Sequence, residues 1–85
     1  MATPNELSDF QDAYGIVVRD ARLRRGYSQV ELGEKCGLDR TYISGIERGR
    51  RNPSLKTVLI LARALRIRPH RILKLAEQGS GWTRA

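Results

Sequence analysis

Apolar residues recur at intervals of three and four positions along most of the chain, which is the spacing of a buried helix face. The first such stretch begins at Ser8 or Asp9, either of which can cap a helix, and it ends near Arg25, just before Gly26. Its apolar face comprises Phe10, Tyr14, Val17, Val18 and Ala21. No stretch alternates apolar and polar residues with the period of a strand. The pattern therefore predicts an all-α fold.

Capping residues and glycines divide the next part of the chain into two short helices. Ser28, followed by Glu31, forms a capping box that begins the first of them, and Gly37 ends it. Asp39 caps the second, which continues to about Arg48. These two elements and the turn between them have the arrangement of a helix-turn-helix unit.

Two more helices follow a loop that contains glycine, asparagine and proline. Ser54 caps the fourth helix, and Pro69 suits the first turn of a fifth helix that ends near Glu77. The apolar face of the fourth helix comprises Leu55, Val58, Leu59, Ala62 and Leu65. We expect the five helices to form one compact domain.

The chain length agrees with this, because 85 residues leave no room for a second folded unit. We expect the single domain to have its core over about residues 8–77. Residues 1–7 and residues 78–85, which include Trp82, are expected to be flexible tails.

The helix-turn-helix interpretation rests on six positions at which the type of residue is constrained. Gly33 must be small, because the third helix crosses the second there, and Gly37 must accept a positive φ in the turn. The other four positions need apolar residues, and they hold Leu32, Leu38, Ile43 and Ile46. An ordinary antiparallel helix pair would explain the apolar spacing but not the arginines that surround it.

The distribution of charge indicates a polyanionic partner. The chain holds 16 Lys and Arg against 9 Asp and Glu, which gives a formal net charge of +7. Residues 1–18 contain three acids and no base, whereas residues 40–51 contain four arginines and one acid. A second basic stretch, Arg63–Lys74, holds four arginines, one lysine and no acid. Nucleic acid and an anionic membrane surface would both suit this charge, and the first is favoured.

The segment from Tyr27 to Leu55 indicates a family. It reads Tyr-Ser-Gln-Val-Glu-Leu-Gly-Glu-Lys-Cys-Gly-Leu-Asp-Arg-Thr-Tyr-Ile-Ser-Gly-Ile-Glu-Arg-Gly-Arg-Arg-Asn-Pro-Ser-Leu and resembles the Cro/C1-type, or XRE-type, helix-turn-helix family. The likeness covers about residues 13–75, and the part from Leu38 to Asn52 is similar to the controller proteins of restriction–modification systems. The resemblance implies a lambda-repressor-like DNA-binding fold and a small dimeric regulator that binds an inverted repeat near a promoter.

In such a unit the second helix lies in the major groove, with its N-terminal residues nearest the base edges. Arg40, Thr41 and Ser44 occupy the base-reading positions. Arg40 can bond a guanine through two hydrogen bonds or contact a phosphate, and we favour the base contact because other arginines serve the backbone. Gly45 adds no base contact and is expected to permit close approach of the DNA.

The expected contacts to the DNA backbone come from Ser28, Gln29, Tyr42, Arg48, Arg50, Arg51 and Asn52. The family resemblance implies that Gln29 also braces the recognition helix. Tyr42 is equally suited to donate its hydroxyl to a phosphate and to pack on the helix surface, and each arginine has the alternative of a solvated side chain. The resemblance further implies a structural ion pair between Arg22 and Glu47, which joins the first and third helices.

Proteins of this kind bind as two-fold dimers to half-sites roughly 34 Å apart. The C-terminal region holds more apolar residues than one small core needs, and we expect the dimer interface to comprise Ile67, Ile72, Leu73 and Leu75. The alternative is that these residues close the core of the single chain.

No enzyme activity, metal, cofactor or small-molecule ligand is expected. His70 has no cluster of cysteines or acids at metal-ligand spacing, and one histidine does not complete a catalytic arrangement with Cys36. The single cysteine suits the reducing cytoplasm. The longest apolar run, Val58–Ala62, is far shorter than the roughly 20 residues that cross a bilayer.

We therefore expect a cytoplasmic, sequence-specific transcriptional regulator that binds double-stranded DNA as a homodimer, with RNA polymerase as a candidate further partner. Four alternatives stay open. They are a phage-type repressor, an antitoxin autoregulator, a protein-interaction module that does not bind DNA, and a membrane-surface protein that uses Arg63–Lys74.

Overall fold

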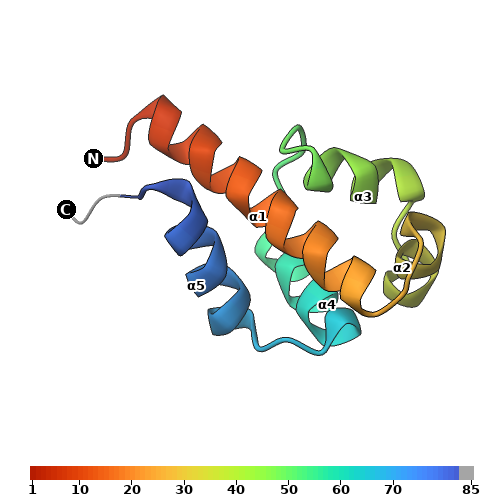
Figure 1. Ribbon diagram of the computed structural model, residues 1–85. Helices are drawn as coiled ribbons and strands as arrows, with labels where there is room; N and C mark the ends of the chain where they lie inside the picture. The colour runs from red at the N-terminus through yellow and green to blue at the C-terminus, as the bar shows by residue number, and fades with distance from the viewer. Residues whose placement is uncertain (83–85) are drawn as a thin grey trace.

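One long helix and four shorter ones make up the structure. The computed structural model describes residues 1–82, with helices α1 (Pro4–Arg24), α2 (Gln29–Cys36), α3 (Arg40–Glu47), α4 (Leu55–Leu65) and α5 (Pro69–Ser80) (Figure 1). The described residues contain no strand, and the predicted all-α fold of five helices is confirmed. The last part of the predicted C-terminal tail, residues 83–85, lies outside the described residues.

The start of α1 differs from the predicted one. Thr3 is the N-cap: its hydroxyl accepts the Glu6 N–H at 3.1 Å, and the Glu6 carboxylate accepts the Thr3 N–H at 2.9 Å. This capping box precedes the first apolar repeat, so the apolar pattern alone placed the helix start too late. The prediction that Ser8 or Asp9 caps the helix was therefore wrong, and residues 4–7, expected in a tail, are part of α1.

The other helix ends follow the predicted signals, with one extension. The hydroxyls of Ser28 and Ser54 cap α2 and α4 by accepting the N–H three residues along, at 3.0 Å and 3.1 Å. Gly37 ends α2 with a φ of 68°. α5 begins as predicted but continues to Ser80, so residues 78–80 are helical and do not form a tail.

All five helices contribute to one core. Its largest fully buried side chains are Val18, Leu32, Ile43, Ile46, Leu61, Leu65 and Ile72. Complete burial of one such side chain stabilises the fold by roughly 1.5–3 kcal/mol. Of the apolar residues predicted for the helix-turn-helix unit, Leu32, Ile43 and Ile46 are buried, and Leu38 packs half-buried against the core.

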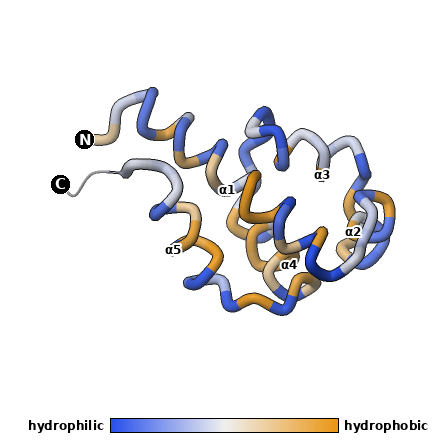
Figure 2. Tube along the Cα trace, in the orientation of Figure 1, coloured by the Kyte–Doolittle hydropathy of each residue, from blue (hydrophilic) through white to orange (hydrophobic). Residues whose placement is uncertain are grey.

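The buried face of α4 differs in part from the predicted one. Leu61 and Thr57 lie in the core, whereas Leu55 and Leu59 are 71% and 48% exposed. Figure 2 shows hydrophobic residues along much of α4, so hydropathy alone did not separate its two faces. The correction leaves two large apolar side chains, one helical turn apart, on the surface.

α1 crosses α3 at Gly15, a position that the sequence analysis did not single out. A Cβ atom at Gly15 would lie 2.7 Å from the carbonyl oxygen of Glu47 and closer still to that of Ile46. The backbones of the two helices are therefore in contact at this glycine, which sets the distance between α1 and α3.

Replacing Gly15 by alanine should lower the free energy of unfolding by about 1–3 kcal/mol, because the added methyl group forces the two helices apart. Gly79 in α5 is the matched control, since a Cβ there would meet only the Ala13 methyl group, at 3.8 Å. Gly79→Ala should raise the free energy of unfolding by roughly 0.5–1 kcal/mol. Urea denaturation of both variants measures the difference, and effects of equal sign and size would contradict the close crossing.

Candidate nucleic-acid interface

The turn between α2 and α3 is tight and depends on two glycines. A Cβ atom at Gly33 would lie 2.5 Å from the carbonyl oxygen of Leu38 in the turn. Gly37 has a φ of 68°, in the left-handed region that favours glycine. Gly33 and Gly37 therefore leave little room for any other residue, as predicted. The turn that they permit brings the N-terminus of α3 to the surface.

At this N-terminus the Thr41 side chain is held by the Asp39 cap. The N–H and the hydroxyl of Thr41 both donate to Oδ1 of Asp39, each at 2.9 Å. These bonds hold the pKa of the Asp39 carboxyl below its usual value, so the carboxylate is ionised and only accepts. The Thr41 oxygen is left as a hydrogen-bond acceptor. Arg40 beside it is exposed, and Ser44, one turn further along, is half-buried.

Tyr42 points toward α4 and is half-buried. Its hydroxyl donates to Oγ1 of Thr57 at 3.4 Å, and the Ser54 hydroxyl donates to the same oxygen at 3.1 Å. Of the two roles considered for Tyr42, this geometry favours packing on the helix surface over a contact to phosphate.

The Arg51 side chain packs across the buried Gly45. A Cβ atom at Gly45 would collide with Cγ of Arg51, and the Arg51 guanidinium carbon lies 5.3 Å from the centre of the Tyr42 ring. The expectation that Gly45 permits close approach of DNA was therefore wrong, because Arg51 occupies that space. The small residue instead fixes the position of a basic side chain.

The loop after α3 is anchored to two helices. The N–H groups of Arg50 and Arg51 both donate to the carbonyl oxygen of Gly45, at 2.8 Å and 3.1 Å. From α1, the Gln11 side-chain amide donates to the carbonyl oxygen of Gly49 at 2.8 Å. Gln11 was missed by the sequence analysis, since nothing local marks a contact between residues so far apart in the chain.

The loop presents a basic surface beside the C-terminal end of α3. Its exposed side chains are those of Arg48, Arg50, Arg51 and Asn52. The one acid in residues 40–52 is Glu47, which is buried. No carboxylate of this segment therefore offsets the field of the exposed arginines.

Glu47 is paired with Arg22, as the family resemblance implied. Arg22 donates through Nε to Oε2 of Glu47 at 2.6 Å and through Nη2 to Oε1 at 2.9 Å, and its third donor group binds the carbonyl oxygen of Tyr27 at 2.9 Å. The hydrogen bonds to Glu47 raise the pKa of the Arg22 guanidinium. The pair ties α1 to the last residue of α3.

The first residues of α2 join the same network. Gln29 donates its side-chain amide to Oε1 of Glu47 at 3.1 Å, which is the bracing contact expected for it. Ser28 is exposed, and its hydroxyl is used in the capping box. The start of α2 and the end of α3 are thus held together through one buried carboxylate.

The four residues expected at the dimer interface do not form one surface. Ile72 is completely buried in the core of its own chain, and Ile67 is half-buried against that core. Leu73 and Leu75 are 38% and 36% exposed, but they face different grooves on the two sides of α5. The prediction is therefore wrong for Ile72, which fills the core. Ile67 and Leu75 line one groove beside α5, and Leu73 lines the other.

The described part of the chain offers no group of three or more His, Cys, Asp or Glu side chains that could hold a metal ion. Burial raises the pKa of the Cys36 thiol. No helix among residues 1–82 is long and apolar enough to cross a membrane.

Comparison with known proteins agrees with this geometry. The sequence profile of the family described as "Helix-turn-helix" matches residues 18–77. The protein named "Neisseria hypothetical transcription factor", from Neisseria meningitidis serogroup B, is 41% identical over 76 residues, which cover 86% of this chain and 72% of that protein. Control protein C.BamHI of Bacillus amyloliquefaciens is 41% identical over 68 residues, which cover 79% of this chain and 84% of that protein.

A solved structure extends the likeness to three dimensions. The restriction–modification controller protein C.AhdI from Aeromonas hydrophila is 44% identical, with a TM-score of 0.71 over 73% of this chain and 94% of that chain. The family match begins within α1 and includes all of α2, α3 and α4. The chain belongs to the helix-turn-helix family of DNA-binding transcriptional regulators.

Proposed function

We propose that this protein is a sequence-specific regulator that binds an inverted-repeat operator as a two-fold dimer. The observation that carries the proposal is the exposed N-terminus of α3, where Arg40 stands beside a Thr41 side chain held by Asp39. In the major groove this end of α3 faces the base edges. Likeness to C.BamHI and C.AhdI supports a role as the controller protein of a restriction–modification system. The proposal also places the protein in the cytoplasm, with RNA polymerase as a further partner.

The two exposed residues differ in the bases that they suit. Arg40 offers paired donors that match O6 and N7 of guanine. The Thr41 hydroxyl proton is committed to Asp39, so its oxygen suits a donor, namely the amino group of adenine or cytosine. Ser44 adds a hydroxyl one turn further along the groove.

Contacts to phosphates are assigned to the ends of the motif. The position of the protein on the duplex is fixed at two places. These are Arg48 and Arg50 in the loop after α3, and Ser28 and Gln29 at the N-terminal end of α2. Arg51 is held in place by Gly45 and serves the same surface together with Asn52.

Binding should weaken steeply as salt is added, because phosphate contacts release counterions. If a dimer neutralises roughly 6–8 phosphates, the logarithm of the binding constant should fall against the logarithm of salt concentration with a slope of about −5 to −7. Fluorescence anisotropy with an operator duplex measures this slope. Arg50→Ala should make this slope shallower. Arg71 lies on α5, on the side of α1 that faces away from α3, and Arg71→Ala should leave the slope unchanged. A slope near zero would contradict the assignment of the basic loop.

Two protomers are needed, because one recognition helix reads only a few base pairs. We place the dimer surface on the outer face of α4 and the adjoining side of α5. The large apolar residues exposed there are Leu55, Leu59 and Leu73. Leu55 and Leu59 were assigned to the core by the sequence pattern, so their exposure supplies the apolar surface that a partner would cover.

Sedimentation equilibrium should find dimers at micromolar concentration, and Leu59→Glu should convert them to monomers of 9.6 kDa. Burying a carboxylate in an apolar interface costs free energy. Leu23→Glu is the control, because Leu23 is a comparably exposed leucine on α1. Wild-type protein that is monomeric both free and on DNA would contradict the dimer, and dimer loss in Leu23→Glu alone would contradict its location.

A further inference from the structure

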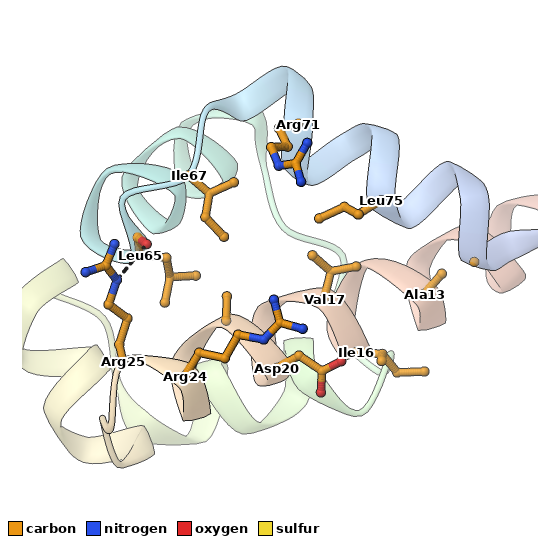
Figure 3. Close-up of a pocket in the computed structure, with 12 residues that line it drawn as sticks. Ala13, Ile16, Val17, Asp20, Arg24, Arg25, Leu65, Ile67, Arg71 and Leu75 are labelled. Atoms are coloured by element: carbon orange, nitrogen blue, oxygen red, sulfur yellow. Dashed lines mark hydrogen bonds between the residues drawn. The ribbon is translucent and has the colours of Figure 1, made fainter.

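A groove opens between α1 and α5, on the side of α1 that faces away from α3. Its volume is about 580 Å³, and Figure 3 shows side chains of α1, α5 and the segment between α4 and α5 lining it. α1 contacts α3 through Gly15 and Arg22. The rotation of a helix places Val17 and Arg24 on the opposite flank. DNA bound along α3 therefore leaves this groove open.

The floor of the groove is apolar. It is formed by Ala13, Val17, Ala21, Leu65, Ile67 and Leu75. Ile16, at the edge of the groove, is 58% exposed, and Leu75 is partly exposed as well. Contiguous apolar surface on a small charged protein commonly marks a site of interaction.

The rim of the groove is basic. Arg24, Arg25 and Arg71 surround it, against the single acid Asp20. Arg25 is fixed by a hydrogen bond from its Nε to the carbonyl oxygen of Leu65, at 3.1 Å. The side chains of Arg24 and Arg71 have no hydrogen bond or ion pair with any residue in the described part of the chain. The rim therefore offers unpaired guanidinium groups beside an apolar floor.

We propose that this groove docks an acidic amphipathic helix of a partner protein. From Ala13 to Arg24 the helix α1 rises about 16 Å, which matches about three turns of a partner helix. Apolar side chains on one face of that helix fill the floor, and carboxylates on its flanks pair with the guanidinium groups of Arg24 and Arg71. The site is separate from both the DNA surface and the proposed dimer surface on α4. The proposal therefore does not depend on the proposed function.

The test uses the full chain and three synthetic peptides of roughly 14 residues, which is slightly longer than the three turns that span the groove. The first is a helix with leucines along one face and glutamates on its flanks. The second replaces each glutamate by lysine, and the third scrambles the first so that no apolar face remains. Fluorescence anisotropy should detect binding of the first peptide alone, and methyl NMR shifts should map to Ile16, Val17 and Leu75. Equal binding of the scrambled peptide, or shifts elsewhere, would overturn the proposal.

Charge-reversal variants locate the site. Arg71→Glu should weaken binding of the first peptide by about tenfold or more, because it replaces an attractive contact by a repulsive one. Arg50→Glu makes the same change of charge in the loop after α3. It should impair DNA binding and leave peptide binding unchanged. Arg71→Glu should keep the preference for operator over unrelated DNA. Failure of the DNA proposal would therefore not affect the peptide result.

Two other occupants give different outcomes. Sedimentation with phosphatidylserine vesicles that is lost in Arg71→Glu, without binding of the acidic peptide, would assign the groove to a membrane surface and overturn the proposal. Self-association of the wild type that is lost in Leu75→Glu would assign it to a second copy of the chain, which would also overturn it. Leu75 lies partly exposed on α5, so this substitution leaves the core intact.

Discussion

Glu47→Ala is expected to lower the free energy of unfolding by about 3–5 kcal/mol, because it leaves a buried guanidinium without its partner. Arg22 donates to both carboxylate oxygens of Glu47, at 2.6 Å and 2.9 Å, and the two side chains are 10% and 3% exposed. The same carboxylate also accepts a bond from Gln29. Small domains have a total stability of roughly 5–15 kcal/mol, so this one substitution brings the protein close to unfolding.

Urea denaturation of three variants tests this prediction. Glu34→Ala, at an exposed position on α2, should change the free energy of unfolding by less than about 0.5 kcal/mol. The double variant Arg22→Met with Glu47→Leu removes both charges together and should recover much of the loss, since well-packed apolar residues can replace a buried ion pair. Equal unfolding midpoints for Glu47→Ala and Glu34→Ala would show that the pair does not hold α3.

Arg40→Ala should cost roughly 1–3 kcal/mol per half-site on the preferred sequence, or about 2–6 kcal/mol for a dimer, and much less on unrelated DNA. The reason is that a guanine contact made by a planar guanidinium carries sequence information, whereas a phosphate contact carries affinity alone. Arg40→Lys should not restore the loss fully, because an ammonium group cannot form the two parallel bonds.

The ratio of operator affinity to non-specific affinity, at one salt concentration, decides the role of Arg40. In Arg40→Ala this ratio should fall, whereas in Arg50→Ala both affinities should fall together and the ratio should hold. An unchanged ratio for Arg40→Ala would make Arg40 a phosphate contact and would move base reading to Thr41 and Ser44.

Much of the fold was predictable because its determinants are local. The capping residues and the glycine turn are specified by residues two to four positions apart, and they placed α2, α3 and the start of α4 correctly. A capping box is also present at Thr3 and Glu6. The apolar repeat begins further along the chain, and the helix start was predicted from that repeat and not from the cap. The ends of helices are therefore predicted more accurately from capping residues than from hydrophobic periodicity.

The predictions that failed depend on contacts between distant segments. α4 is apolar on most sides, so only its packing against α1, α2 and α5 decides that Leu61 is buried and Leu59 exposed. Ile72 was assigned to a dimer surface because the amino-acid sequence does not show how much space in the core the other four helices leave for it. Gly15 and Gln11 were missed for a related reason, since each serves a residue more than thirty positions away.

Within the helix-turn-helix unit, the spacing of residues predicted the turn between the helices but not every side-chain contact. Gly33 and Gly37 were predicted from the demands of a tight turn, and both are required by the geometry. The role of Gly45 could not be derived in this way, because Arg51 packs on it after a loop whose path the sequence does not specify. The hydroxyl of Thr41 likewise becomes an acceptor only through its bond to Asp39.

Selection of bound DNA from a random pool tests the central claim most directly, because it examines specificity, symmetry and half-site spacing in one measurement. The account predicts enrichment of an inverted repeat whose half-sites lie about one helical turn apart, roughly 10 base pairs from centre to centre. Each half-site should contain a guanine that Arg40→Ala no longer selects. A pool that stays random, or that yields a single unrepeated site, would contradict a two-fold regulator that reads bases through the N-terminus of α3.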